Sequence, residues 1–116
     1  SNPATSVIEV FPAYAAALTN LQLASHYWVL YWLHHADRTA LVRRARPGQQ
    51  TRGVLASRAP NRPNPIALSA VELLAVEDRF LTVSGLDCLD GTPLLDLKPY
   101  VPVDDAKPTA QIAWQP

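Results

Sequence analysis

Apolar and polar residues alternate with a period of two along several short segments of the chain, which is typical of half-buried strands. The segment from Tyr27 to Leu33 is apolar on both alternating faces and rich in aromatic and β-branched residues, so we predict a strand covered on both sides. The long apolar segment from Ile66 to Val76, the polar turn after it and the alternation from Phe80 to Ser84 together favour a β-hairpin. Further strands are predicted at Val7 to Val10, Leu41 to Arg46, Gly53 to Ser57 and Leu94 to Val101.

One short helix is predicted from Pro12 to Leu18, because proline is favoured in the first turn of a helix and an alanine run follows it. Six or seven short strands with turn signals at regular intervals predict a mostly β chain folded as a single-sheet β-barrel. A chain of 116 residues can bury one core but has little room for a second, so we predict one domain over residues 1–116. The proline-interrupted tail after Pro102 is expected to lie over the surface, with Trp114 packing back or onto a partner.

The composition argues against several classes of protein and site. No apolar run approaches the ~20 residues of a membrane-spanning helix, and no charged leader precedes an apolar segment, so we expect a cytoplasmic protein without a membrane partner. Cys88 is the only cysteine, which excludes an internal disulfide and a cysteine-rich metal site, and we expect it to pack as a small apolar side chain. The three histidines lack the spacing of paired ligands, so no metal is expected.

The net charge is zero, but positive and negative residues are separated along the chain. No acid occurs between Asp37 and Glu72, and this stretch holds seven of the ten basic residues, all of them arginine. From Glu72 to Asp105, eight acids outnumber two basic residues. The asymmetry predicts a basic face able to meet an RNA backbone, while the alternative is a solvated arginine surface balanced by acids nearby in space.

The segment from Arg52 to Pro65, RGVLASRAPNRPNP, can form neither a long helix nor an interior strand, because its prolines fix φ and remove backbone donors. We predict a rigid loop that holds Arg58 and Arg62 at little entropic cost, with Asn64 bracing Arg62 by hydrogen bonds. Guanidinium forks suit carboxylates, phosphates and base edges, so both arginines are candidate ligand-binding residues. The alternative is a proline-rich turn whose arginines are merely solvated.

A second block, GLDCLDGTPLLDLKPYVP from Gly85 to Pro102, contains an Asp-Gly turn signal followed by an alternating strand. Together with SHYWVLYWLHH, Ser25 to His35, these blocks resemble the TrmO-like, or TsaA-like, family of S-adenosylmethionine-dependent tRNA adenosine N6-methyltransferases. The resemblance runs from about Val7 to Trp114. It is specific, because the patterns RxPxRPNPI and LDGTPxLDxKPY occur in the family's order and at about its spacing.

The resemblance implies S-adenosyl-L-methionine as the methyl donor and a homodimer with the donor near the subunit interface. It implies as substrate the threonylcarbamoyl-modified adenosine beside the anticodon of a tRNA, whose splayed base can be reached without opening a duplex. By motif position, the residues implied for the donor site are His34, Arg58, Arg62, Pro63, Leu89, Asp90, Gly91 and Thr92. Those implied for the substrate are Arg58, Arg62, Asn64, Lys98 and Tyr100.

On the same resemblance, Arg58 or Arg62 would read the carboxylate of the threonylcarbamoyl group or a backbone phosphate. Trp28, Trp32 and Trp114 are candidates for apolar area at a dimer interface, with core packing as the alternative for the first two.

Methyl transfer from a sulfonium to nitrogen is an in-line displacement that needs no metal, so the protein must mainly position the reactants and keep water out. A group that takes the proton of the exocyclic amine would assist, and His34, Asp90 and Asp96 qualify by residue type, of which we assign the catalytic role to His34 and Asp90. The alternatives are structural. A histidine at the end of an apolar strand is more often a structural group, as we assume for His26 and His35, and aspartate before glycine commonly caps a turn.

Family members usually begin with an extra strand and a Pro-Arg-Gln-Pro-like loop that contributes to the donor site, and longer ones carry a C-terminal extension. We expect an N-terminally shortened form with one wall of the donor site missing, in which restoring the segment would raise donor affinity. Two alternatives stay open: a noncatalytic dimeric module that binds an adenosine-like ligand or RNA, and a methyltransferase with a different acceptor.

Overall fold

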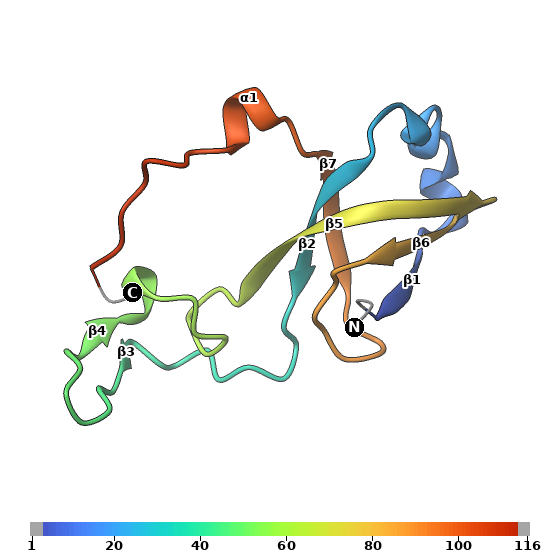
Figure 1. The fold of residues 1–116 in the computed structure, drawn as a ribbon. Helices are drawn as coiled ribbons and strands as arrows, with labels where there is room; N and C mark the ends of the chain where they lie inside the picture. Colours follow the sequence, from blue (N-terminus) through green and yellow to red (C-terminus); the bar gives the residue numbers. More distant parts are fainter. Residues whose placement is uncertain (1–3, 114–116) are drawn as a thin grey trace.

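The computed structural model describes residues 4–113, and its main feature is one antiparallel sheet of five strands (Figure 1). The strands lie in the order β1-β6-β5-β2-β7. Their bounds are Thr5–Glu9 for β1, His26–Trp32 for β2, Ile66–Glu77 for β5, Phe80–Ser84 for β6 and Leu94–Pro99 for β7. The structure confirms a mostly β chain with little helix. The predicted packing of Trp114 falls outside the described residues.

The predicted hairpin and short helix are both present. Strands β5 and β6 pair antiparallel up to Glu77 opposite Phe80, and Asp78 in the turn between them has φ +55°, a conformation that aspartate tolerates. The predicted helix forms as the 3₁₀ helix η1, Pro12–Leu18, and a further 3₁₀ turn, η2, covers Leu21–Leu23. The tail after β7 begins with one helical turn, α1, Pro102–Asp105, which has no buried residue.

The core lies on one face of the sheet. Every second residue of β2 points into it, so Tyr27, Val29 and Tyr31 are buried, and Val71 and Leu81 from β5 and β6 are each 1% exposed. Burial of one such side chain contributes roughly 1.5–3 kcal/mol, so these few positions account for much of the stability of the sheet.

The opposite face of the sheet is covered less than the sequence predicts. Trp28, Leu30 and Trp32 alternate with the core residues of β2 and are only half-buried. Their partners on β5 include Ile66 and Leu68, which are 47% and 48% exposed. The prediction of a strand covered on both sides therefore holds fully for one face only. The apolar character of the other face leaves area available for contact with another surface.

The sheet is open at both edges in the described part of the chain, because β1 pairs only with β6 and β7 pairs only with β2. Closure into a barrel therefore stays a prediction. Within residues 4–113, no helix has the length and apolar character needed to cross a membrane.

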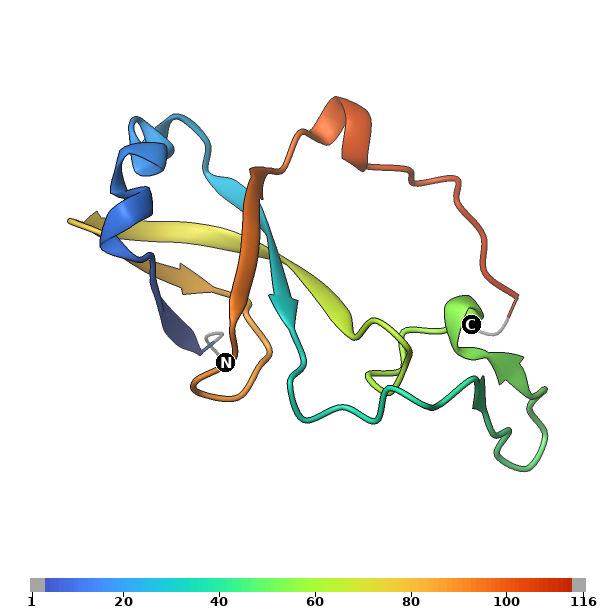
Figure 2. The ribbon, with the colours of Figure 1, turned by 180° about the vertical axis from the view of Figure 1, so that it is seen from behind.

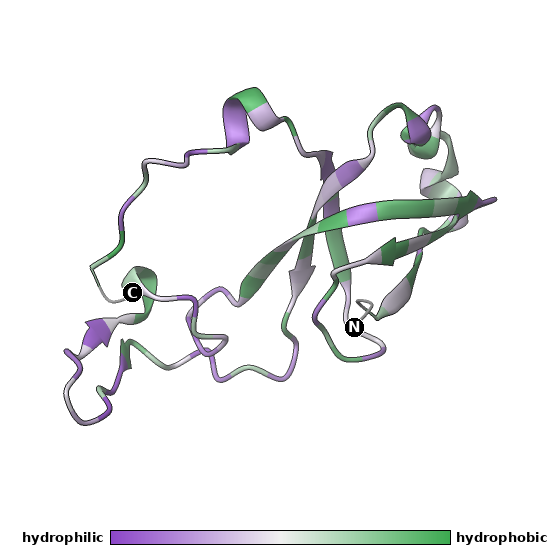
Figure 3. Cartoon of the chain, viewed as in Figure 1, coloured by the Kyte–Doolittle hydropathy of each residue, from purple (hydrophilic) through white to green (hydrophobic). Residues whose placement is uncertain are grey.

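A basic hairpin extends away from the sheet, as Figure 2 shows from behind. Where longer strands were predicted, the chain forms only β3, Val42–Arg43, and β4, Arg52–Gly53, followed by the 3₁₀ helix η3, Val54–Ala56. We call residues 41–59 the arginine arm. The radius of gyration of the molecule is 16.4 Å, against about 13 Å for a compact domain of this length, and the projecting arm and tail explain the excess. Figure 3 shows polar colouring on β4 and mainly apolar colouring along β5 and β6.

Candidate functional site

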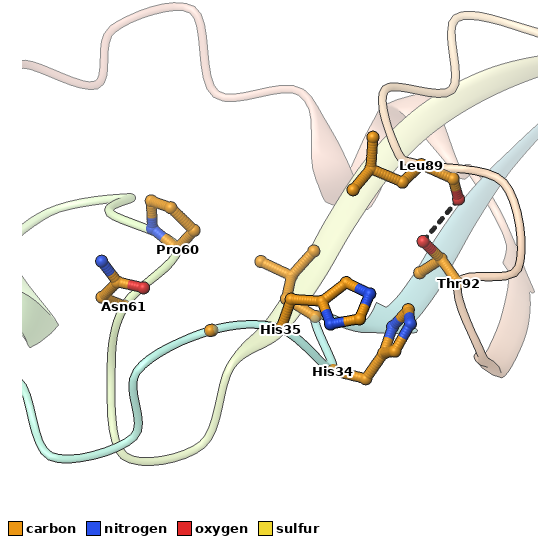
Figure 4. Close-up of a pocket in the computed structure, with 8 residues that line it drawn as sticks. His34, His35, Pro60, Asn61, Leu89 and Thr92 are labelled. Carbon is orange, nitrogen blue, oxygen red and sulfur yellow. Dashed lines mark hydrogen bonds between the residues drawn. The ribbon is translucent and has the colours of Figure 1, made fainter.

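An open hollow of about 240 Å³ lies where three segments of the chain meet (Figure 4). One segment directly follows β2, the second is the proline-rich loop before β5, and the third connects β6 to β7. The lining residues are Leu33, His34, His35, Ala36, Pro60, Asn61, Leu89 and Thr92. Sites for drug-sized ligands usually measure roughly 300–1,000 Å³, so this hollow can hold part of such a ligand.

Two adjacent histidines form one wall of the hollow. Strand β2 ends at Trp32, and the next backbone N–H, of Leu33, donates to the Pro65 carbonyl at 2.9 Å, which fixes the end of the strand against the proline-rich loop. His34 and His35 follow with ring centroids 3.9 Å apart and planes tilted by 41°. Both side chains are exposed and lie at the hollow (Figure 4). Sequence reasoning selected His34 but assigned His35 to a structural role.

The Asp-Gly turn forms as predicted and supplies a second wall. Gly91 has φ +82°, a left-handed conformation that glycine adopts without cost, and the Thr92 N–H closes the turn on the Leu89 carbonyl at 3.2 Å. The Thr92 hydroxyl donates to the same carbonyl at 2.6 Å. Leu89 and Thr92 line the hollow, whereas Asp90 and Gly91 lie in the same turn outside the lining set.

Cys88, just before the turn, is exposed, so its predicted packing is wrong. It lies in a loop, where strand alternation does not apply.

Arg38 fastens the proline-rich loop to the end of β2. Its Nε donates to the Pro63 carbonyl at 2.8 Å, its Nη2 donates to Asn64 Oδ1 at 3.3 Å, and its guanidinium lies 5.1 Å from the Trp32 ring centroid. The predicted brace between Asn64 and Arg62 is therefore wrong, because the Asn64 side chain binds Arg38 instead.

A second contact joins the same two segments. The Asp37 backbone N–H donates to Asn61 Oδ1 at 2.9 Å. The hydroxyl and the backbone N–H of Thr39 donate to Asp37 Oδ1 at 2.6 and 2.8 Å, and these bonds hold the pKa of Asp37 below its usual value. Arg38 and Asn61 thus position the loop from both sides.

The two arginines of the proline-rich loop have different surroundings. Nη1 of Arg62 donates to the carbonyls of Ser57 and Ala59 at 2.9 and 3.2 Å, and the residue is half-buried. Arg58 is exposed, and its side chain makes no hydrogen bond or ion pair with residues 4–113. Arg62 therefore helps to build the loop, while Arg58 is available to an external anion.

Some predicted site residues lie away from the hollow. Lys98 is opposite Trp28 in the β2–β7 pair, and the Tyr100 N–H donates to the His26 carbonyl, at the far end of β2 from His34. At about 3.3 Å per residue along β2, Lys98 lies roughly 20 Å from His34 and Tyr100 roughly 26 Å. Asp96 is opposite Leu30 on β7, on the half-buried face of the sheet.

Sequence reasoning missed several residues that form or hold the hollow. Pro60 is a specified position of the quoted RxPxRPNPI pattern and could have been selected from it, whereas Asn61 stands at one of its variable positions. Arg38 offered no such signal, because its partners in the loop are 25 and 26 residues away. In the part of the chain that the structure describes, no three His, Cys, Asp or Glu side chains gather so that they could hold a metal ion.

Comparison with known proteins gives a consistent result. The profile of the family described as tRNA-methyltransferase O N-terminal domain matches residues 1–106. A probable S-adenosyl-L-methionine-binding protein of Archaeoglobus fulgidus is 44% identical over 95% of this chain. A protein described in the same words, from Methanothermobacter thermautotrophicus, is 50% identical over 82% of the chain. A mouse tRNA (adenine(37)-N6)-methyltransferase is 40% identical over 73% of the chain.

The fold is also similar to a solved structure. The crystal structure of TrmO from Pseudomonas aeruginosa superposes with a TM-score of 0.79 and 38% sequence identity over 97% of this chain and 49% of that one. The chain covers 30% of the Archaeoglobus protein, 69% of the Methanothermobacter protein and 20% of the mouse enzyme. The chain therefore spans half or less of the Archaeoglobus, mouse and Pseudomonas proteins and about two thirds of the Methanothermobacter protein.

Proposed function

The chain belongs to the family of tRNA-methyltransferase O N-terminal domains, and from this premise we propose that it takes part in S-adenosylmethionine-dependent methyl transfer to N6 of a threonylcarbamoyl-modified adenosine beside the anticodon of a tRNA. The observation that supports the proposal is the meeting of His34, the Leu89–Thr92 turn and the proline-rich loop at one hollow. These are the motifs on which the resemblance rests, and they are far apart in the sequence.

The lining of the hollow suits S-adenosyl-L-methionine, which would supply the methyl group. Leu33, Pro60 and Leu89 offer apolar contacts for the adenine ring, and the amide NH₂ of Asn61 and the Thr92 hydroxyl can orient polar groups. At about 240 Å³ the hollow has room for part of the donor. We propose that a second copy of the chain completes the site, so that the active form is a cytoplasmic homodimer, and that the half-buried face with Trp28 and Trp32 contributes interface area.

Within this site we assign the proton-accepting role to His34. Its ring lies in the lining, whereas Asp90 lies outside it and Asp96 lies on β7. The His35 ring packs against His34 and would hold it in place as a positioning residue. Arg58, which is exposed, is the residue that we assign to the carboxylate of the threonylcarbamoyl group.

Two measurements on the same protein test the proposal: calorimetry with S-adenosylmethionine, and incorporation of labelled methyl into total tRNA. We expect His34→Ala to lower the rate of methyl transfer about 100-fold or more, as loss of a general base does. His26→Ala is the matched control, because His26 is exposed at the other end of β2, where its Nδ1 is 2.7 Å from Ser25 Oγ. Donor binding without transfer would favour the noncatalytic module, and no binding of either ligand would refute the proposal.

A further inference from the structure

The arginine arm carries five positive charges and no negative one. Its basic residues are Arg43, Arg44, Arg46, Arg52 and Arg58, with no lysine among them. All except Arg52 are exposed. The ion pair found within residues 4–113 joins Arg79 to Glu9, outside the arm, and in that range the side chains of Arg43, Arg44, Arg46 and Arg58 contact no acid. The described acids of the second half of the chain therefore do not neutralise these four arginines by direct pairing.

The exposed arginines of the arm lie close together along the chain. Arg43 is in β3, Arg44 and Arg46 follow it directly, and Arg58 comes after η3. A phosphate backbone that runs along the arm could contact several of these guanidinium groups.

The position of the arm relates it to the hollow. The arm projects from the sheet (Figures 1 and 2), and the chain that leaves it leads directly to Pro60 and Asn61 in the wall of the hollow. Arg44 and Arg46 lie in the segment that joins β3 to β4, at the end of the ribbon. A ligand whose reactive group occupies the hollow can therefore extend along the arm.

We propose that the arginine arm binds the sugar-phosphate backbone of an RNA on the side of the nucleotide that occupies the hollow. Arginine suits this role because its planar fork binds phosphate oxygens through two parallel hydrogen bonds. The inference rests on the proposed function only in taking RNA as the ligand class. In this proposal the arm binds the RNA, and the hollow binds S-adenosylmethionine.

The test is a salt titration of binding between the protein and a fluorescein-labelled RNA stem-loop, followed by fluorescence anisotropy. The variant Arg44→Gln/Arg46→Gln removes two exposed charges outside any strand, and Arg79→Gln/Lys107→Gln removes the same net charge outside the arm. Loss of two phosphate contacts should reduce the slope of log affinity against log salt by about 1.4. If wild type and the arm variant bind the RNA with equal affinity near 1 M salt, this difference in slope makes the arm variant bind about 25-fold more weakly than wild type at about 0.1 M salt.

The result is informative whether or not the proposed function holds. Calorimetry with S-adenosylmethionine should give equal donor affinity for wild type and arm variant, so a protein that binds no donor but loses RNA affinity in the arm variant would refute the function and keep the inference. Equal salt slopes for the arm variant and its charge-matched control would overturn the inference. A changed oligomeric state of the arm variant in sedimentation, with RNA affinity unchanged, would also overturn it, because the arm would then contact a second copy of the chain.

Discussion

In the five-stranded sheet, the residues that hold the structure are apolar and almost completely buried, as Val29, Val71 and Leu81 illustrate at 1% exposure each. Around the hollow, by contrast, every lining residue is exposed or half-buried. The walls are held there by hydrogen bonds that Arg38 and Arg62 donate to loop carbonyls and that Asn61 Oδ1 accepts from the Asp37 N–H. The difference indicates that stability depends mainly on the sheet, while the shape of the hollow depends on a few polar contacts, each of which adds less to stability than a buried core side chain.

The largest effect on stability is expected from Leu81→Ala in β6. Removing a buried leucine side chain leaves a cavity and typically costs about 2–5 kcal/mol. Leu68→Ala on the half-buried face, where the side chain is 48% exposed, should cost less than about 1 kcal/mol. Urea unfolding of both variants measures the difference. Equal losses would show that the two faces of the sheet contribute equally and that burial in the core does not set the stability of the sheet.

The same contrast explains which elements could be predicted from sequence. Alternation reports a strand with one buried face, so β2, β5, β6 and β7 and the hairpin turn were found at nearly their observed positions. It failed at residues 41–57, where β3 and β4 contain two residues each and the buried Val54 lies in the 3₁₀ helix η3 instead of a strand. The hollow depends on contacts such as Arg38 to Pro63, and no local pattern specifies a partner 25 residues away.

Arg62→Ala should affect both stability and binding. Its guanidinium satisfies the carbonyls of Ser57, which is 6% exposed, and Ala59. Loss of these charge-assisted bonds should cost about 1–2 kcal/mol of unfolding free energy. The loosened loop should also weaken donor binding.

Arg58→Ala is the matched control for Arg62→Ala in the same loop. Because Arg58 is exposed, its loss should change the free energy of unfolding by no more than about 0.5 kcal/mol. If the two variants lose the same stability in urea, Arg62 is not a brace of the loop and the two arginines are equivalent.

Arg38→Ala tests whether Arg38 holds the proline-rich loop in position, and it does not change a residue that lines the hollow. The side chain is exposed, so we expect a stability loss of no more than about 1 kcal/mol. We expect a fall in donor affinity of about threefold to tenfold, because the proline-rich loop loses two hydrogen bonds and the contact with Trp32. Arg44→Ala removes an exposed arginine from the arm and should leave donor affinity unchanged. Calorimetry that finds the two variants alike would show that Arg38 does not position the wall.

The smallest effect is expected from Asp105→Asn, which alters a polar contact on the sheet side of the molecule. Asp105 Oδ2 accepts the Val101 N–H at 2.8 Å and the Trp28 Nε1–H at 2.9 Å, and these bonds, the first being the larger cause, lower the pKa of Asp105 below its usual 3.8. A lowered pKa means that the stabilisation is fully present above about pH 4 and disappears as pH falls through the pKa of the folded state. The urea midpoint of wild type should therefore exceed that of Asp105→Asn by a small constant amount between about pH 7 and 4, and the gap should close below that range. The exposed side chain of Asp104 makes no hydrogen bond with residues 4–113, so Asp104→Asn should leave the midpoint at pH 7 nearly unchanged. If the difference in urea midpoint widened as the pH fell, the carboxylate of Asp105 would destabilise the fold. Polar contacts at the sheet would then destabilise the protein, whereas those around the hollow stabilise it.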